Sequence, residues 1–193
     1  MIAIGTTIVS PQTGEQLTFL STKDSSDGHL FRAELVVQPG TYVVKSHIHL
    51  LQEESFVVLE GRYGWRIGKE TGVAEPGTTL VCPPGVPHSQ WNAGDVPMRI
   101  YYEHRPALTS AEILFETQFG LSRDGKLTAT GNIPLLQAAV LLEEVGDFIR
   151  PAFPPLWAQG LLFPPLAIIG KWFGYRARYP KYRSQETPSE EAK

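Results

Sequence analysis

Residues 40–61 read GTYVVKSHIHLLQEESFVVLEG and contain the pattern that decides the fold. His47 and His49 are separated by one residue, and two such positions on a β-strand point to the same face. Glu54 begins a second apolar run that ends in a turn at Gly61, so its carboxylate can face the two imidazoles from a neighbouring strand. This spacing predicts that the three side chains meet inside a β-structure.

A second stretch, residues 77–92, reads GTTLVCPPGVPHSQWN and adds one more histidine. Its proline–glycine turn delivers His88 onto a further strand. Three neutral imidazoles and one carboxylate suit Fe(II), Mn(II), Ni(II), Cu(II) or Zn(II) better than Ca(II) or Mg(II). Such a set leaves one or two coordination positions open, which is typical of a catalytic rather than a structural metal site.

Two alternatives concern the ligands themselves. Glu53 is the competing carboxylate, but it should point to the opposite face of its strand from Glu54. Taken alone, His47 and His49 are better interpreted as strand histidines that face solvent or form hydrogen bonds in a core. Together with Glu54 and His88 at this spacing, we interpret them as metal ligands.

The first half of the chain alternates between apolar and polar residues, as in strands with one buried face. Phe31, Ala33, Leu35 and Val37 form one such alternating set. Glycine, proline and asparagine turns recur every several residues, and the 18 glycines and 16 prolines are spread along the chain. This pattern predicts a β-sandwich or a closed barrel.

The two stretches resemble the two signature motifs of the cupin superfamily. The first motif, G-x5-H-x-H-x(3,4)-E-x6-G, is matched by His47, His49, Glu54 and Gly61, with Gly40 one residue further from His47 than the pattern asks. The second, G-x5-P-x-G-x2-H-x3-N, is matched throughout, by Gly77, Pro83, Gly85, His88 and Asn92. The resemblance covers about residues 30–105. It implies a mainly β fold, a double-stranded β-helix or jelly-roll barrel, with the metal held inside.

The resemblance also bears on function. It implies a mononuclear metal oxidoreductase similar to the quercetinase-like dioxygenases, acting on a small organic molecule, with Glu54 as both ligand and general base. Cupins also serve as isomerases and as non-catalytic binding or sensing modules, and these alternatives stay open. We therefore expect a metal-dependent dioxygenase or a barrel that binds a metal or small ligand without turnover.

The chain is expected to divide into a barrel domain (1–106), a helical apolar extension (107–183) and a disordered tail (184–193). Thr109 and Glu112 match a capping box that opens a helix ending near Gly120. A second helix is predicted over 134–149, because its apolar residues return at three- and four-residue steps. The extension is expected to cover the barrel, a partner subunit or a membrane surface.

The segment 151–170 has no charged residue and is about as long as a membrane span. Prolines within it argue against a spanning helix, because they interrupt backbone hydrogen bonding. We therefore expect burial against the barrel or in a dimer, or else peripheral contact of 151–183 with a membrane. Aromatic side chains next to a run of basic residues are typical of segments that lie on an anionic membrane, so they favour the membrane alternative. The basic residues are Lys171, Arg176, Arg178, Lys181 and Arg183.

Composition limits the partners. The net charge of -3 gives no electrostatic reason to bind nucleic acid, whereas 42% hydrophobic residues suffice for a core. The single cysteine, Cys82, excludes an intrachain disulfide and fits a reducing compartment. With no leader pattern at the first residues, we expect a cytoplasmic protein that forms a homodimer and binds a small molecule, with association to a membrane as the alternative to a free location.

The remaining histidines, the cysteine and several strand aromatics are interpreted mainly as structural residues. His29 and His104 fall outside both motifs and are expected at the surface or at strand ends, without a role. Cys82 is interpreted as a small apolar filler. Four strand aromatics are candidates for lining the cavity, although strand aromatics usually serve packing alone; they are Trp65, Trp91, Tyr101 and Tyr102.

Overall fold

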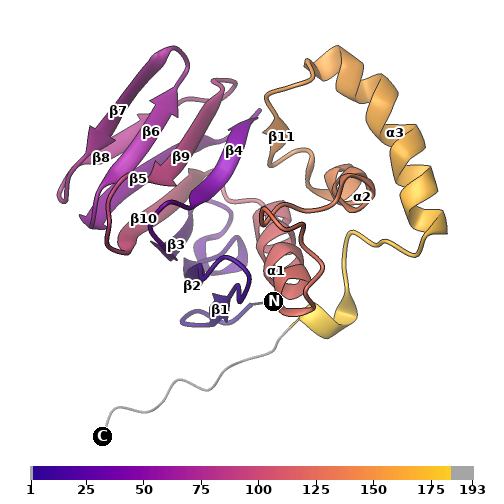
Figure 1. Cartoon of the computed structure of the whole chain (residues 1–193), viewed down its shortest axis with the longest axis horizontal. Coiled ribbons are helices and arrows are strands. Elements are labelled where there is room, and N and C mark those ends of the chain that lie inside the picture. The colour runs from indigo at the N-terminus through magenta and orange to yellow at the C-terminus, as the bar shows by residue number, and fades with distance from the viewer. Residues whose placement is uncertain (1, 184–193) are drawn as a thin grey trace, which may run out of the picture.

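The computed structural model describes residues 2–183, apart from the side chains of residues 42–44. Within these residues the strands form two antiparallel sheets, on the left in Figure 1. The first sheet has the order β1 (Thr7–Val9), β2 (Gln16–Ser21), β3 (Phe31–Val37), β10 (Met98–Arg105), β5 (Glu53–Glu60) and β8 (Thr79–Cys82). The second has the order β11 (Arg150–Pro151), β4 (Tyr42–Ile48), β9 (His88–Asn92), β6 (Tyr63–Ile67) and β7 (Glu70–Ala74). The predicted mainly β, jelly-roll fold is confirmed.

The alternation of strand β3 shows why the sheets form. Phe31, Ala33, Leu35 and Val37 are all buried, and the residues between them are partly exposed. The same apolar core includes side chains from the facing sheet, among them Tyr63 of β6. Burial of one face of each sheet therefore fixes the register of the strands, since a slip by one residue would expose the core set.

Two glycine turns hold the strands that carry the polar side chains. Gly85 has a φ of 76°, and its backbone N–H donates to the carbonyl of His49 over 2.7 Å. Gly61 has a φ of 78°, and a Cβ at this position would lie 2.8 Å from Cα of Met98. A side chain at either turn would be strained, so these positions favour glycine.

The C-terminal part is helical, with α1 (Thr109–Arg123), α2 (Leu135–Val145) and α3 (Leu156–Trp172), and short 3₁₀ turns lie at η1 (Asp24–Ser26) and η2 (Pro180–Tyr182). The first two helices were predicted, although α1 runs on past Gly120 and α2 ends before Ile149. The prediction of a capping box at Thr109 and Glu112 was wrong. Leu108 occupies the N-cap, and Glu112 instead accepts a hydrogen bond from the Lys23 backbone N–H over 3.2 Å.

The three helices relate differently to the barrel. Phe119 of α1 and Leu141 of α2 belong to the same hydrophobic core as the buried side chains of the strands. Helix α3 packs against α2 through a small separate cluster around Ala167, and in Figure 1 it lies at the far edge of the molecule. None of the helices within 2–183 has the length and hydropathy needed to cross a bilayer. The domain boundary after residue 106 stays a prediction, and the tail 184–193 lies outside the described residues.

Candidate metal centre

The four predicted ligands lie together between the two sheets. His47 in β4 pairs directly with His88, the first residue of β9, and His49 follows β4 immediately. Glu54 projects from β5 in the opposite sheet. All four side chains are buried, and one ligand atom from each lies within 4.8 Å of all the others. The structure thus brings together the four residues that the sequence singles out, and their role as metal ligands stays a prediction.

Backbone carbonyls set the tautomer of the three imidazoles. Because a carbonyl oxygen only accepts, the Nδ1 atom that faces it must carry the proton. The Nδ1 atoms of His47, His49 and His88 each face such a carbonyl. The acceptors are Lys45 O at 3.0 Å, Phe148 O, and Val86 O at 2.8 Å, respectively. In each neutral ring the Nε2 lone pair is left as the donor to a metal, as is typical of metal-binding histidines.

The spacing of the imidazole Nε2 atoms and the Glu54 carboxylate oxygens is compatible with a bound cation between them. The Nε2 atoms of His47 and His49 are 3.2 Å apart, and Glu54 Oε1 is 3.6 Å from His49 Nε2. Both carboxylate oxygens of Glu54 and Nε2 of His88 are buried, and this Nε2 lies against Oε2 of Glu54. Buried acceptors that face one another are costly unless a proton or a cation lies between them. Metal–ligand bonds of about 2.0–2.2 Å would give ligand separations of roughly 3–4 Å, close to those observed.

The electrostatics favour the metal-binding forms of two of the ligands. Burial, reinforced by His88, lowers the pKa of His47 well below 6.5, so this ring is neutral. Burial raises the pKa of Glu54, but the surrounding histidines outweigh it and hold this pKa well below 4.5, so the carboxylate is ionised. Burial lowers the pKa of His88, yet hydrogen bonds to Cys82 and Glu54 raise it overall. A proton on His88 is therefore the main competitor of a metal ion.

The structure separates the two neighbouring glutamates. Glu53 is exposed, whereas Glu54 is fully buried and faces the histidines. This is the alternation expected of adjacent residues on a strand. Of the two candidate carboxylates, only Glu54 is therefore placed to bind a metal ion.

Two buried residues lie next to the site, although the sequence analysis assigned neither of them a role there: His104, near the end of β10 and not at the surface, and Cys82. His104 is fully buried, and its Nε2 lies 3.2 Å from Glu54 Oε1 and 3.4 Å from His49 Nε2. Burial lowers the pKa of His104 to about 4, so this ring is neutral at pH 7. Cys82 is buried, as expected of a filler, but its Sγ also lies 3.1 Å from Nδ1 of His88. Both residues stand opposite Glu54 on the strands that flank β5.

Asn92, which closes the second motif, has a structural role. Its side-chain amide donates to Val37 O over 2.9 Å and to Val96 O over 2.7 Å, and its Oδ1 accepts from the Gly94 N–H over 2.9 Å. These bonds tie the end of β9 to β3 and close the following turn. Asn92 therefore keeps β9, and with it His88, in place.

The tyrosine pair of β10 divides between the two faces of its sheet. Tyr102 is buried, and burial and the charge of Glu54 raise its pKa well above 10. Tyr101 points to the other face, where Arg32 lies over its ring at 5.3 Å. Only Tyr102 of this pair therefore lies near the histidine cluster.

Comparison with protein families identifies the barrel. Residues 33–102, which contain all four candidate ligands, match the family model described as "Cupin domain". The chain contains a cupin domain. A curated relative, an uncharacterized protein of Methanocaldococcus jannaschii, is 35% identical over 68 residues, which are 35% of this chain and 54% of that protein. The match thus spans about half the length of that relative.

Solved structures similar to this chain include a predicted oxalate decarboxylase from Thermotoga maritima. It is 19% identical with a TM-score of 0.45, over 49% of this chain and 81% of that one. A sugar phosphate isomerase from Silicibacter pomeroyi is 21% identical with a TM-score of 0.43, over 48% of this chain and 59% of that one. These values describe resemblance over about half of the chain.

A large cavity lies beside the cupin domain, where β4 faces helices α1 and α2. Its volume is about 750 Å³, and of the four clustered residues only His47 contributes to its wall. Its lining includes the apolar residues Leu114, Leu141, Val145 and Ile149. It also includes polar residues, among them Glu15, Thr41, Lys45 and Asn132. Such a volume and mixed lining are typical of sites for small organic ligands.

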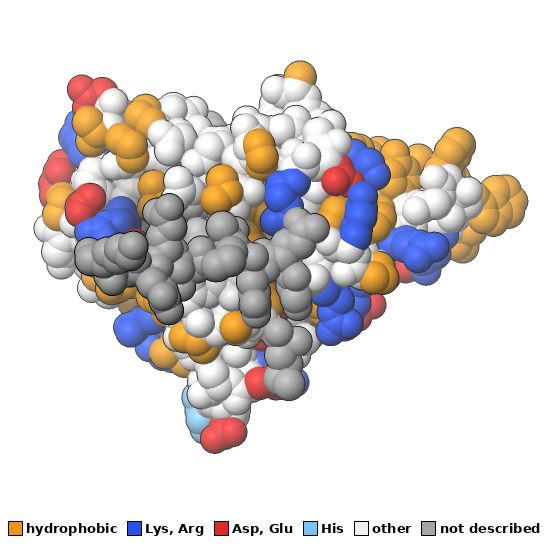
Figure 2. Space-filling model, turned by 90° about the horizontal axis from the view of Figure 1, so that it is seen from below, with side chains coloured by type: hydrophobic (Ala, Val, Ile, Leu, Met, Phe, Trp, Pro, Cys, Tyr) orange, Lys and Arg blue, Asp and Glu red, His pale blue; other side chains and the backbone are white. Residues whose placement is uncertain are grey.

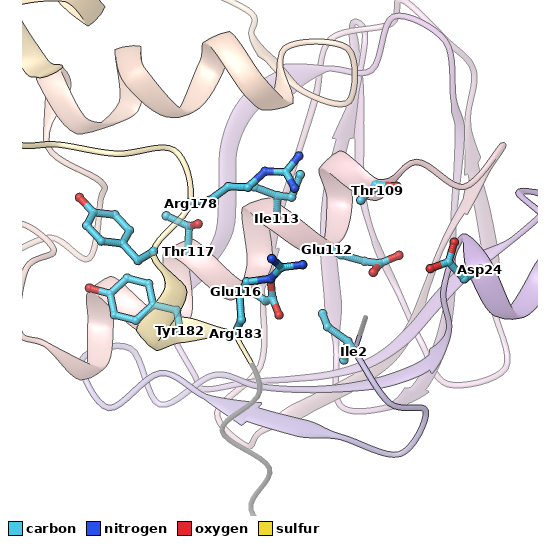
Figure 3. Close-up of a pocket in the computed structure, with 11 residues that line it drawn as sticks. Ile2, Asp24, Thr109, Glu112, Ile113, Glu116, Thr117, Arg178, Tyr182 and Arg183 are labelled. Atoms are coloured by element: carbon cyan, nitrogen blue, oxygen red, sulfur yellow. The ribbon is translucent and has the colours of Figure 1, made fainter.

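A second cavity, of about 80 Å³, runs along α1 on another side of the molecule (Figure 3). Its lining includes none of the four clustered residues. Figure 3 shows the carboxylates of Glu112 and Asp24 pointing toward each other, and burial together with Asp24 raises the pKa of Glu112. This small cavity is therefore separate from the candidate metal centre.

Proposed function

We propose that His47, His49, Glu54 and His88 bind one divalent transition-metal ion and that the protein uses it as a dioxygenase-type oxidoreductase on a small organic molecule. The observation that carries the metal assignment is the convergence of buried ligand atoms: Nε2 of His47 and of His49 are 3.2 Å apart, and Oε1 of Glu54 is 3.6 Å from Nε2 of His49. A metal held by these four residues would supply a Lewis acid and, if redox-active, a route for electrons to dioxygen.

Glu54 is the residue that we assign to proton transfer. Its low pKa keeps the carboxylate deprotonated, which is the form required of a general base. His104 acts as a positioning residue: its neutral ring, 3.2 Å from Oε1, can hold the carboxylate through an Nε2–H. Tyr102, protonated because of its raised pKa, closes the same side of the site with an apolar ring.

We assign substrate binding to the 750 Å³ cavity, because His47 is among the residues that line it. Members of the cupin family bind small molecules, and a cavity of this volume can hold one. The apolar side chains from α1 and α2 would bury the carbon skeleton of a ligand, and polar side chains such as Lys45 and Asn132 would orient its oxygen atoms. The helical extension thus contributes part of the proposed substrate site.

Turnover measurements test this proposal. We expect the protein, stripped of metal and reloaded separately with Fe(II), Mn(II), Ni(II), Cu(II) or Zn(II), to consume dioxygen with a flavonol or diketone only when a redox-active ion is present. Substrate loss should match oxygen uptake, because the proposed reaction incorporates dioxygen. An oxygen electrode and product analysis by mass spectrometry provide the two readouts.

The alternatives predict other results in the same experiment. Equal turnover by the metal-free protein would refute a metal-dependent reaction. Conversion of a sugar phosphate without oxygen uptake would identify an isomerase instead. Saturable binding of a panel compound with no turnover under any metal would identify a binding module. Each of these three results would replace the dioxygenase proposal.

A further inference from the structure

Helix α3 contacts the rest of the protein through its small and polar residues. Ala167 and Gly170 are buried against α2, and a Cβ on Gly170 would lie 2.7 Å from a methyl group of Val140. The third buried residue is Gln159, whose Nε2 donates to the carbonyls of Pro151 and Pro154, both over 2.7 Å. The inward face of α3 therefore buries little apolar surface.

The opposite face of α3 consists of large apolar side chains in solvent. Trp157, Leu161, Ile168 and Trp172 recur at steps of four and seven residues, which places them on one side of the helix. The two tryptophans are 73% and 87% exposed. More exposed apolar residues surround this row: Phe153, Leu162, Ile169 and Phe173. We call these eight residues the α3 face. A helix with its polar residues inward and its large apolar residues outward is the reverse of a helix folded for water.

The α3 face forms a protrusion rather than a groove. In Figure 2 hydrophobic side chains gather at one pointed edge of the molecule, and Lys and Arg side chains lie next to them. A protruding ridge inserts easily into a deformable surface, whereas two such ridges would touch along a narrow line. The shape therefore favours a lipid surface over a second copy of this chain.

The charges around the α3 face also favour lipid. Residues 151–183 contain no acidic side chain, and the basic residues follow the helix. Arg176 is exposed and forms no ion pair within residues 2–183, while Lys171 and Arg178 pair with Glu143 and Glu144 of α2. Tryptophans at both ends of an apolar helix, beside basic residues, match the chemistry of the interface of an anionic membrane. A second copy would offer no carboxylate from this segment to those cations.

We propose that the α3 face docks on an anionic membrane surface, with the helix lying in the plane of the interface. The docked face lies on the side of α3 turned away from α2, so binding leaves the packing of α2 on the barrel unchanged. The candidate metal centre contributes nothing to this contact. The surface thus provides a localisation function that is independent of the proposed reaction.

Vesicle co-sedimentation of the full chain tests the proposal. We expect the protein to pellet with vesicles of phosphatidylcholine and phosphatidylglycerol, and much less with phosphatidylcholine alone. High salt should weaken the binding, because the basic residues act through screened attraction. In the double variant Leu161→Glu and Ile168→Glu, binding should fall at least about a hundredfold, since two side chains lose their apolar burial.

A matched control comes from α2. Leu135 is exposed to a similar extent as Ile168 but lies outside the α3 face, so Leu135→Glu should pellet like the wild type. Circular dichroism should show that the variants are folded. Pelleting that is absent with both vesicle types, or unchanged in the double variant, would overturn the proposal. So would a lipid-independent dimer that the double variant converts to a monomer, because the face would then belong to a second copy.

Discussion

Replacing His49 with alanine is expected to lower the affinity for the metal at least about a hundredfold. The His49 side chain is 1% exposed and directs its Nε2 at the other candidate ligands, so the variant loses one metal-binding nitrogen at the centre of the site. Four-ligand protein sites bind zinc with roughly 10–16 kcal/mol, or about 3 kcal/mol per ligand, and this corresponds to a factor of at least about 100. Titration against a coloured chelator measures the affinity, and elemental analysis measures the metal content.

His29 provides the control for this variant. It is an exposed histidine on the loop before β3, so His29→Ala should bind metal like the wild type. Loss of His49 should also abolish any metal-dependent turnover in parallel with the metal. An unchanged affinity in His49→Ala would show that this residue is no ligand, and equal losses in both variants would show a nonspecific effect on folding.

Replacing Glu15 with glutamine is expected to stabilise the protein by about 3 kcal/mol at pH 8. Glu15 is 4% exposed, and burial raises its pKa from 4.5 to about 7, against a smaller lowering by the Thr13 hydroxyl. The folded protein therefore retains this proton between pH 4.5 and 7, whereas the unfolded chain releases it. The free energy of unfolding falls with rising pH over that interval, at about 1.4 kcal/mol per pH unit. A glutamine carries no such proton and removes this slope.

Urea unfolding of the two proteins between pH 4 and 8, with a chelator present, measures the difference. The variant and the wild type should be equally stable at pH 4 and should diverge up to about pH 7. Glu70→Gln, at an exposed position of β7, should show no divergence. A constant difference between Glu15→Gln and the wild type across this range would contradict the raised pKa.

The convergence of the candidate ligands was predictable from the sequence because their positions follow rules within single strands. His47 and His49 lie two residues apart, and the alternation of sides separates Glu54 from Glu53. The missed neighbours of the site depend on pairing between strands. His104 and Cys82 both stand opposite Glu54, in registers that only the assembled sheet defines. Strand spacing alone contains no signal for such pairs.

The sequence predicted that the C-terminal part is helical, but it did not predict the cap of α1 or the course of α3. Thr109 and Glu112 have the spacing of a capping box, yet the carboxylate of Glu112 forms a tertiary contact with the backbone of Lys23 instead. Helix α3 continues through Pro164 and Pro165, which are exposed, so the carbonyls that lose their partners can reach water. Homodimer formation and a cytoplasmic location stay predictions, because both depend on partners and surroundings beyond a single chain.

Anomalous diffraction from crystals of the protein loaded with Mn(II) or Zn(II) tests the central claim most directly. The account predicts one strong peak within about 2.0–2.3 Å of Nε2 of His47, His49 and His88 and of a carboxylate oxygen of Glu54. A fully loaded protein whose metal peak is coordinated by other side chains, or which shows no peak between the two sheets, would contradict it.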